Sequence, residues 1–274
     1  MPKRRNKESA TGSRHLALTT RKDAMAPEEN SDNAQQEDRL ADRRVRIFAI
    51  ASRNYCSCLL LIVASATAWS QQAPASDVPA NRALARLMEG NDRYAQAKEQ
   101  HPDETLARRK ELEGGQHPFA VILSCADSRV PPELIFDQGL GDLFVIRVAG
   151  NIVDDDVLGS IEYAVEHLQT KLILVLGHEK CGAVSAAVEG AKEPGHLQSL
   201  LSALQPSVEA SRNLPGDKIH NCVLANARRV ARQIRESEPI LKGFGQKQGV
   251  EVVAADYALD SGKVTVLEEA HPHP

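Results

Sequence analysis

The chain has 274 residues, with 33 Lys+Arg against 37 Asp+Glu and 42% apolar residues. This is enough for one α/β domain with extensions. The first 70 residues hold 12 of the basic and 8 of the acidic residues, so the remainder carries 21 basic against 29 acidic side chains, a net charge of −8. A domain this acidic is a poor candidate for binding nucleic acid or an anionic membrane surface.

The first 70 residues differ from the rest of the chain. Residues 1–44 are polar and lack an apolar period, so we interpret them as disordered or as an upstream stretch from a misplaced start codon. A secretory signal is predicted at 45–70, where basic residues, an apolar run over 59–68 and small residues follow in the expected order. The run is shorter than the roughly 20 apolar residues of a membrane-spanning helix. We therefore expect a periplasmic or secreted protein; an inner-membrane anchored or cytoplasmic protein is the alternative.

Residues 71–274 form the predicted domain. Apolar residues recur at helical spacing from Asn81 to Ala97, which predicts an amphipathic N-terminal helical arm, and a short helix is expected from Glu104 to Leu112. Three short apolar runs follow, at 119–124, 143–147 and 171–176. Their branched residues, and the glycines or helix signals after them, predict buried parallel strands joined by crossover helices.

The connections and the C-terminal part complete this pattern. Helices are predicted to begin at 131–133, at 154–156 and at Cys181, the last of these ending by Gly190, and a long helix spans 219–234. Runs at 250–255 and 263–267 predict a closing strand pair. The predicted fold is therefore an α/β domain with a mostly parallel central sheet flanked by helices.

Two cysteines and one histidine stand where predicted strands end. Cys125 follows the first strand, and His178 and Cys181 follow the third. Ligands of open α/β sheets bind beyond the carboxyl ends of the strands, so the two segments can meet. Two thiolates and one imidazole favour zinc, and three protein ligands leave a fourth position open, which is typical of catalytic zinc. The alternative is that these cysteines are small core residues and the histidine a turn residue.

The other cysteines carry less information. Cys56 and Cys58 fall in the predicted signal, and Cys222 lies beside an apolar helical face, where we expect a buried thiol. Three cysteines in the remaining part do not make a disulfide framework. A thiol redox protein is disfavoured, because Cys125 and Cys181 form no Cys-x-x-Cys pair.

The segment Cys-Ala-Asp-Ser-Arg at 125–129 and the segment His-Glu-Lys-Cys at 178–181 match the Cys-x-Asp-x-Arg and His-x-x-Cys signatures of the β-class carbonic anhydrases. The chain resembles that family over roughly residues 81–268. The resemblance implies reversible hydration of carbon dioxide to bicarbonate and a proton by zinc-bound hydroxide, with one Zn²⁺ per chain on Cys125, His178 and Cys181. It also implies a catalytic pair, in which Asp127, clamped by Arg129, orients the nucleophile and accepts its proton.

The resemblance extends to the substrate pocket and to assembly. It implies substrate contacts at five positions, Gln116, Phe144, Ala149, Tyr163 and Gly182; the glutamine is typical of plant-like members, and ordinary packing explains the first four positions equally well. Members regulated by bicarbonate have a tryptophan where this chain has Ile122, so such regulation is not expected. A homodimer or a multiple of dimers is implied, with the N-terminal helix as an arm exchanged between subunits.

Two other functions remain open at this point. One is a related zinc enzyme acting on another small linear substrate such as carbon disulfide, or with esterase-like side activity. The other is a zinc-binding assembly protein without turnover. The presence of both Asp127 and Arg129 argues against the second.

Overall fold

The computed structural model describes residues 78–268. The leader expected at 1–44 and the signal segment expected at 45–70, with Cys56 and Cys58, lie outside the described residues. Within residues 78–268, none of the helices combines the length and the apolar character needed to cross a membrane.

The described residues form helices, short 3₁₀ turns (η) and strands, which in chain order are α2 (Ala80–Ala95), α3 (Leu106–Glu111), η1 (Leu112–Gly114), β1 (Ala120–Ser124), α4 (Pro132–Ile135), β2 (Leu143–Arg147), η2 (Ala149–Asn151), α5 (Asp155–Glu166), β3 (Leu172–His178), α6 (Gly182–Val188), α7 (Leu197–Ser211), α8 (Lys218–Glu236), α9 (Leu241–Gln248), β4 (Glu251–Tyr257) and β5 (Val264–Leu267).

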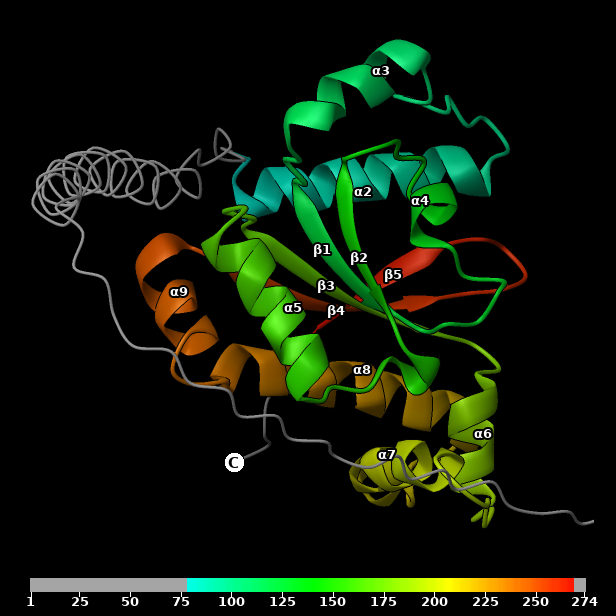
Figure 1. Ribbon diagram of the computed structural model, residues 1–274. Coiled ribbons are helices and arrows are strands. Elements are labelled where there is room, and N and C mark those ends of the chain that lie inside the picture. The colour runs from blue at the N-terminus through cyan, green and yellow to red at the C-terminus, as the bar shows by residue number, and fades with distance from the viewer. Residues whose placement is uncertain (1–77, 269–274) are drawn as a thin grey trace, which may run out of the picture. The chain divides into compact units, whose positions relative to one another are not determined.

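The strands form one sheet in the order β2-β1-β3-β4-β5 (Figure 1). Strands β1 to β4 are parallel, and β5 pairs antiparallel with β4. This confirms the predicted α/β fold with a mostly parallel sheet and a closing strand pair. Because β1 pairs directly with β3, the carboxyl ends of these two strands lie side by side, and that edge of the sheet positions the site.

Helices cover both faces of the sheet (Figure 1). Alternate side chains of β1 and β3 point to opposite faces, as the period of a strand requires. Ile122 and Leu174 belong to the core cluster that includes α2, whereas Leu123 and Val175 belong to the cluster that includes α5 and α8. Both central strands are therefore buried on both sides, which explains their continuous apolar sequences.

Strand β2 was predicted to be buried, and this prediction is wrong. Its first four residues are only half-buried and Arg147 is exposed, because β2 forms one edge of the sheet. Its sequence resembles that of the central strands, since Phe144 and Ile146 still pack against the core on the α5 side. An apolar run shows that a strand packs on a core, but it does not fix the strand's place in the sheet order.

Most helices begin where local signals predict them. The side chain of Asp154 accepts a hydrogen bond from the Val157 amide and so caps α5, and Asp217 caps α8 in the same way. Two helices were not predicted: α7 contains Pro206, and α9 contains Gly243 and Gly245. These residues disfavour a helix locally, but apolar residues of both helices, such as Leu204 of α7, are buried, and this tertiary packing outweighs weak propensity.

The predicted N-terminal helix, α2, packs against its own domain. Leu87 is fully buried in the core that α2 shares with β1 and β3, and the buried side chain of Asn91 connects two distant parts of the chain. Its Nδ2 donates to the carbonyls of Ile135 and Gly262 at 3.1 and 2.8 Å, and its Oδ1 accepts from the Val264 amide at 2.8 Å. Exchange of this helix between subunits stays a prediction.

Replacing Asn91 with alanine is expected to lower the free energy of unfolding by about 3 kcal/mol, because buried backbone partners would lose their hydrogen bonds. Urea denaturation measures the change. The matched control is Asn81→Ala on the same helix, where the side chain is exposed and a change of a few tenths of a kcal/mol is expected. Equal effects of the two substitutions would contradict this role for Asn91.

Candidate metal centre

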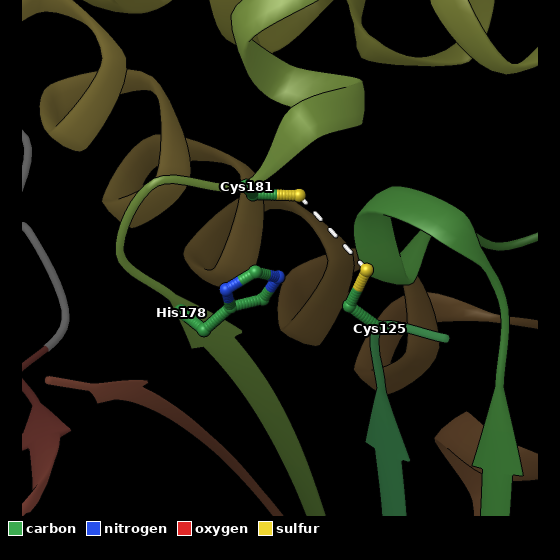
Figure 2. A group of neighbouring side chains, drawn as sticks. All are labelled: Cys125, His178 and Cys181. Carbon is green, nitrogen blue, oxygen red and sulfur yellow. Dashed lines mark hydrogen bonds between the residues drawn. The ribbon is translucent and has the colours of Figure 1, made fainter. Parts of the chain in front are cut away.

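Three side chains meet beyond the carboxyl ends of β1 and β3 (Figure 2). Cys125 directly follows β1, His178 is the last residue of β3, and Cys181 stands immediately before α6. Strand β3 was predicted to end before His178; it runs two residues further and carries the histidine at its end. All three side chains are buried, and their ligand atoms lie within 4.8 Å of one another. Among the described residues, no other group of this kind is found.

The geometry of the three residues fits a tetrahedral zinc ion. Two sulfurs bound to zinc at about 2.3 Å with tetrahedral angles lie about 3.8 Å apart, and the Sγ atoms of Cys125 and Cys181 are 3.9 Å apart. Nδ1 of His178 lies 2.8 Å from the carbonyl of Glu179, to which its N–H donates. This tautomer leaves a lone pair on Nε2, a buried atom without a hydrogen-bond partner among the described residues. The zinc ligands predicted from the sequence are thus brought together in the arrangement that the ion needs.

The short distance between the two buried sulfurs shifts the pKa values of Cys125 and Cys181 in opposite directions. The pKa of Cys125 is lowered to about 4, chiefly by the hydrogen bond from Cys181, while burial opposes the shift. The pKa of Cys181 is raised, first by this hydrogen bond to Cys125 and then by burial. The amides of Ala183 and Val184 at the start of α6 favour the Cys181 thiolate, but the neighbouring sulfur outweighs them. Because zinc binds cysteines as thiolates, binding of the ion releases the protons that these two sulfurs hold.

Asp127 and Arg129 form a closely bonded pair beside the metal centre. The Arg129 guanidinium donates through Nε to Oδ1 at 2.9 Å and through Nη2 to Oδ2 at 2.7 Å, and the Arg129 amide adds a third bond to Oδ1 at 2.9 Å. These contacts hold the pKa of the Asp127 carboxyl well below its usual range. Oδ2 lies 3.9 Å from Nε2 of His178, so an ionised carboxylate faces the metal-binding atoms.

The loop between Cys125 and Arg129 is held by contacts that the sequence did not reveal. Arg147, at the end of β2, donates through Nε to the Cys125 carbonyl at 3.0 Å and through Nη2 to the Asp127 carbonyl. Nη2 of Arg129 also donates to the carbonyl of Lys180 at 3.2 Å, which links the two motif segments. The sequence offered one signal for this role of Arg147, namely that a charged residue ends an otherwise apolar strand.

The predicted substrate residues fall into two groups. Ala149 precedes Gly150, whose amide donates to Cys125 Sγ, and the exposed Gly182 follows Cys181, so both lie beside the metal centre. Gln116, Phe144 and Tyr163 do not, because they lie towards the amino end of the sheet.

Gln116 is exposed and precedes β1. Phe144 pairs with Val121, four residues before Cys125, which corresponds to about 13 Å along a strand. The Phe144 ring lies 6.2 Å, between centroids, from that of Tyr163, whose side chain is exposed on α5. The structure therefore does not bring these three side chains to the metal centre of the same chain.

Comparison with known proteins agrees with this site. A family described as "Carbonic anhydrase" matches residues 120–264. Carbonic anhydrase 2 of Mycobacterium tuberculosis is 41% identical over 194 residues, which cover 66% of this chain and 90% of the relative.

Solved structures give the same result. The β-carbonic anhydrase CafA of Aspergillus fumigatus has a TM-score of 0.56 and 30% identity, with 70% of this chain and 92% of that chain covered. The tetrameric β-carbonic anhydrases of Sordaria macrospora include a chain with a TM-score of 0.55 and 25% identity, with 67% and 96% covered.

The fold and the Cys-His-Cys centre thus define a carbonic anhydrase, as the match over 120–264 indicates. With these relatives, the chain belongs to the β-carbonic anhydrase family.

Proposed function

We propose that the protein catalyses the reversible hydration of carbon dioxide to bicarbonate and a proton. The observation that carries this function is the buried Cys125, His178 and Cys181 group with an ionised Asp127 beside it. Zinc held by three protein ligands supplies the Lewis acidity that makes water a nucleophile near neutral pH. The relatives named carbonic anhydrases support the same reaction.

Within this reaction, Asp127 is proposed to accept a hydrogen bond from the attacking water and to orient its lone pair towards carbon dioxide. Arg129 is proposed to hold the carboxylate in this direction, because it occupies both carboxylate oxygens. The very low pKa keeps Asp127 an acceptor throughout the neutral range. The two guanidinium hydrogen bonds keep the Asp127 carboxylate in one orientation, and this positioning is the contribution of the pair to the rate of hydration.

The experiment that tests the function is stopped-flow carbon dioxide hydration on protein beginning near Gln71, with zinc measured on the same sample. We expect one zinc per chain and rapid hydration. Protein that holds zinc but does not hydrate carbon dioxide would overturn this proposal and favour a zinc-binding assembly protein. Assays with carbon disulfide and with an ester on the same sample test the other substrates, and a faster reaction with either than with carbon dioxide would count against the assignment.

We further propose that the active unit contains at least two copies of the chain. Phe144 and Tyr163 are distant from the metal centre of their own chain, and they lie on or beside β2, a half-buried edge strand. If these residues and Gln116 line a substrate pocket, a second copy has to supply them. The relatives from Sordaria macrospora are described as tetrameric, which is consistent with a dimer or a multiple of dimers.

Complementation between two variants tests this arrangement. Tyr163→Ala is expected to lower kcat/KM on the order of 10- to 100-fold through lost positioning, and Cys125→Ala is expected to be inactive. Co-expressed, the two chains should recover activity, because one supplies the metal centre and the other supplies Tyr163.

The control for this experiment is a mixture of Cys125→Ala and Asp127→Ala chains. Both substitutions damage the same half of the site, so no recovery is expected. Mixed oligomers of the first pair whose activity does not exceed that of Tyr163→Ala alone would show that Tyr163 does not complete a neighbour's site.

We also propose that the protein is exported to the periplasm or secreted. The support is the order of basic, apolar and small residues at 45–70. Cell fractionation with N-terminal sequencing of the mature protein tests the proposal: a new N-terminus near 69–71 in the exported fraction is expected. An uncleaved chain in the cytoplasm would contradict it, and an uncleaved chain in the membrane fraction would indicate an anchor.

A further inference from the structure

A buried chain of hydrogen bonds runs from α8 to one of the metal ligands. Asn226, on α8, is fully buried, and its Nδ2 donates to the carbonyl of Gly150 at 2.9 Å. The amide of Gly150 in turn donates to Sγ of Cys125 at 3.3 Å. The backbone of one residue, Gly150, thus connects the Asn226 side chain to the N–H group that contacts the sulfur.

The partners of Asn226 fix the orientation of its amide. Oδ1 accepts from Oγ of Ser207 at 3.0 Å and from Nη2 of Arg229 at 3.2 Å. Because an arginine can only donate and the Gly150 carbonyl can only accept, the reversed amide would lose both contacts. The Nδ2 donor is therefore directed at Gly150 by the composition of the network.

The network is anchored in α7 as well as in α8. Arg229 donates through Nε to Oγ of Ser207 at 2.8 Å and through Nη2 to the Ala203 carbonyl at 3.0 Å. Ser207, on α7, is fully buried, and both partners of its hydroxyl, Asn226 and Arg229, lie on α8. Two packed helices thus hold the Asn226 side chain in one position, and satisfied buried networks of this kind are rigid.

Gly150 has the backbone that this arrangement needs. Its φ is 74°, in the left-handed region where a side chain is disfavoured, and an added Cβ would lie 3.2 Å from Cδ1 of Leu204. In this conformation the Gly150 carbonyl points to Asn226 while its N–H points to Cys125. The hydrogen bond to the Cys125 sulfur therefore depends on the conformation of the turn at Gly150, which other residues must hold in place.

We propose that Asn226 is a positioning residue for the metal centre: it holds the backbone conformation of Gly150, so that the Gly150 N–H stays bonded to the Cys125 sulfur and limits the charge that this sulfur gives to the metal. The proposal rests on the metal assignment made above. It concerns a residue outside both sequence motifs, 101 positions from Cys125 along the chain.

The expected effects follow from the hydrogen bond to sulfur. An N–H donor stabilises the sulfur lone pairs, so its loss makes the thiolate a stronger electron donor and the metal a weaker Lewis acid. Loss of the bond between Asn226 and Gly150 also lets the turn at Gly150, which contacts the ligand Cys125, change its conformation. Substitutions among residues that orient ligands typically cost 10- to 100-fold in metal affinity.

The first test compares Asn226→Asp with Ser207→Ala. Asn226→Asp keeps the size and the acceptor for Arg229 but puts an oxygen opposite the Gly150 carbonyl. Ser207→Ala weakens the same helix contact but leaves the Nδ2 donor, and Arg229 still holds Oδ1. Both are prepared with cobalt in place of zinc, and with zinc for transfer to a coloured chelator.

For Asn226→Asp we expect the sulfur-to-cobalt charge-transfer band to move to lower energy and zinc to leave about tenfold faster or more. For Ser207→Ala we expect the wild-type band and a rate near that of the wild type. The inference is refuted if Asn226→Asp matches the wild type in both measurements, or if the two variants change equally, since equal changes would indicate only a loosened helix contact.

A second measurement needs no variant and so does not depend on folding of a mutant. In protein loaded with an NMR-active cadmium isotope, a scalar coupling between the metal and the Gly150 amide proton is expected through the sulfur. An assigned Gly150 amide without this coupling would overturn the inference. Wild-type protein that binds no metal would instead overturn the proposed function, whereas a metal-loaded, active enzyme without the coupling would overturn this inference alone.

Discussion

Replacement of a single metal ligand is expected to remove both zinc and activity. In Cys181→Ser and His178→Asn, one of three buried donors is lost. Changes outside the ligand set already cost 10- to 100-fold in affinity, so we expect zinc affinity to fall more than about 100-fold and hydration to fall to the level of the metal-free protein. Metal analysis and stopped-flow hydration measure the two effects.

Metal removal from the wild type gives the same result reversibly. A chelator should abolish hydration, and added zinc should restore it in the wild type but not in the ligand variants. Zinc at about 100 times its dissociation constant stabilises a folded protein by about 2.7 kcal/mol, so the midpoint of thermal unfolding should fall with the metal. Calorimetry of the two forms measures this shift.

Cys222→Ala is the matched control for the cysteine variants. Cys222 is fully buried on α8, and like the two ligand cysteines it forms no disulfide with any described residue. We expect this variant to keep its zinc and its activity with only a modest loss of stability. Loss of zinc in Cys222→Ala, or retention of zinc in Cys181→Ser, would contradict the assigned ligands.

Replacement of Asp127 is expected to separate metal binding from catalysis. Asp127→Ala should keep one zinc per chain, because the ligand atoms come from other residues. Its kcat/KM should fall by about 100-fold or more, because the carboxylate no longer orients the attacking water. The control is Asp92→Asn, which changes an exposed carboxylate on α2 and should leave both values unchanged. Wild-type hydration by Asp127→Ala would exclude a catalytic role.

A double variant tests whether Asp127 and Arg129 act as one unit. Arg129→Ala removes the two hydrogen bonds that the guanidinium donates to Asp127. The third bond of the pair comes from the backbone amide, which alanine retains. We therefore expect the double variant to be little worse than Asp127→Ala alone, since residues that act together are not additive. Additive losses would indicate two independent roles.

The metal centre could be predicted because its residues lie in two short segments at strand ends. Cys125 and the pair His178 and Cys181 follow apolar runs, and the topology of a parallel sheet brings such ends together. The contacts that support the centre could not be predicted in this way. Asn226 and Gly150 are 76 residues apart, and Asn91 bonds to Val264 across 173 residues. No local pattern specifies such partners.

The limits of the fold prediction have similar physical causes. Periodicity located β1, β3 and the long helix α8, but the edge position of β2 depends on strand order, which a single strand does not encode. Helix α7 carried a usable signal, because Leu200, Leu201, Leu204 and Val208 recur at helical spacing. This signal was missed because Pro206 disfavours a helix and because the loop before α7 was predicted to continue to the next helix. The glycines of α9 left no comparable signal.

The ligand set is divided between two segments that only the pairing of β1 with β3 brings together. An incompletely folded chain offers at most the two donors of one segment, so tight capture of the ion has to wait until the sheet has assembled. A chain that crosses a membrane unfolded would consequently arrive empty. Its ion would then come from the compartment in which it folds, and enzyme output there would depend on the local supply of zinc.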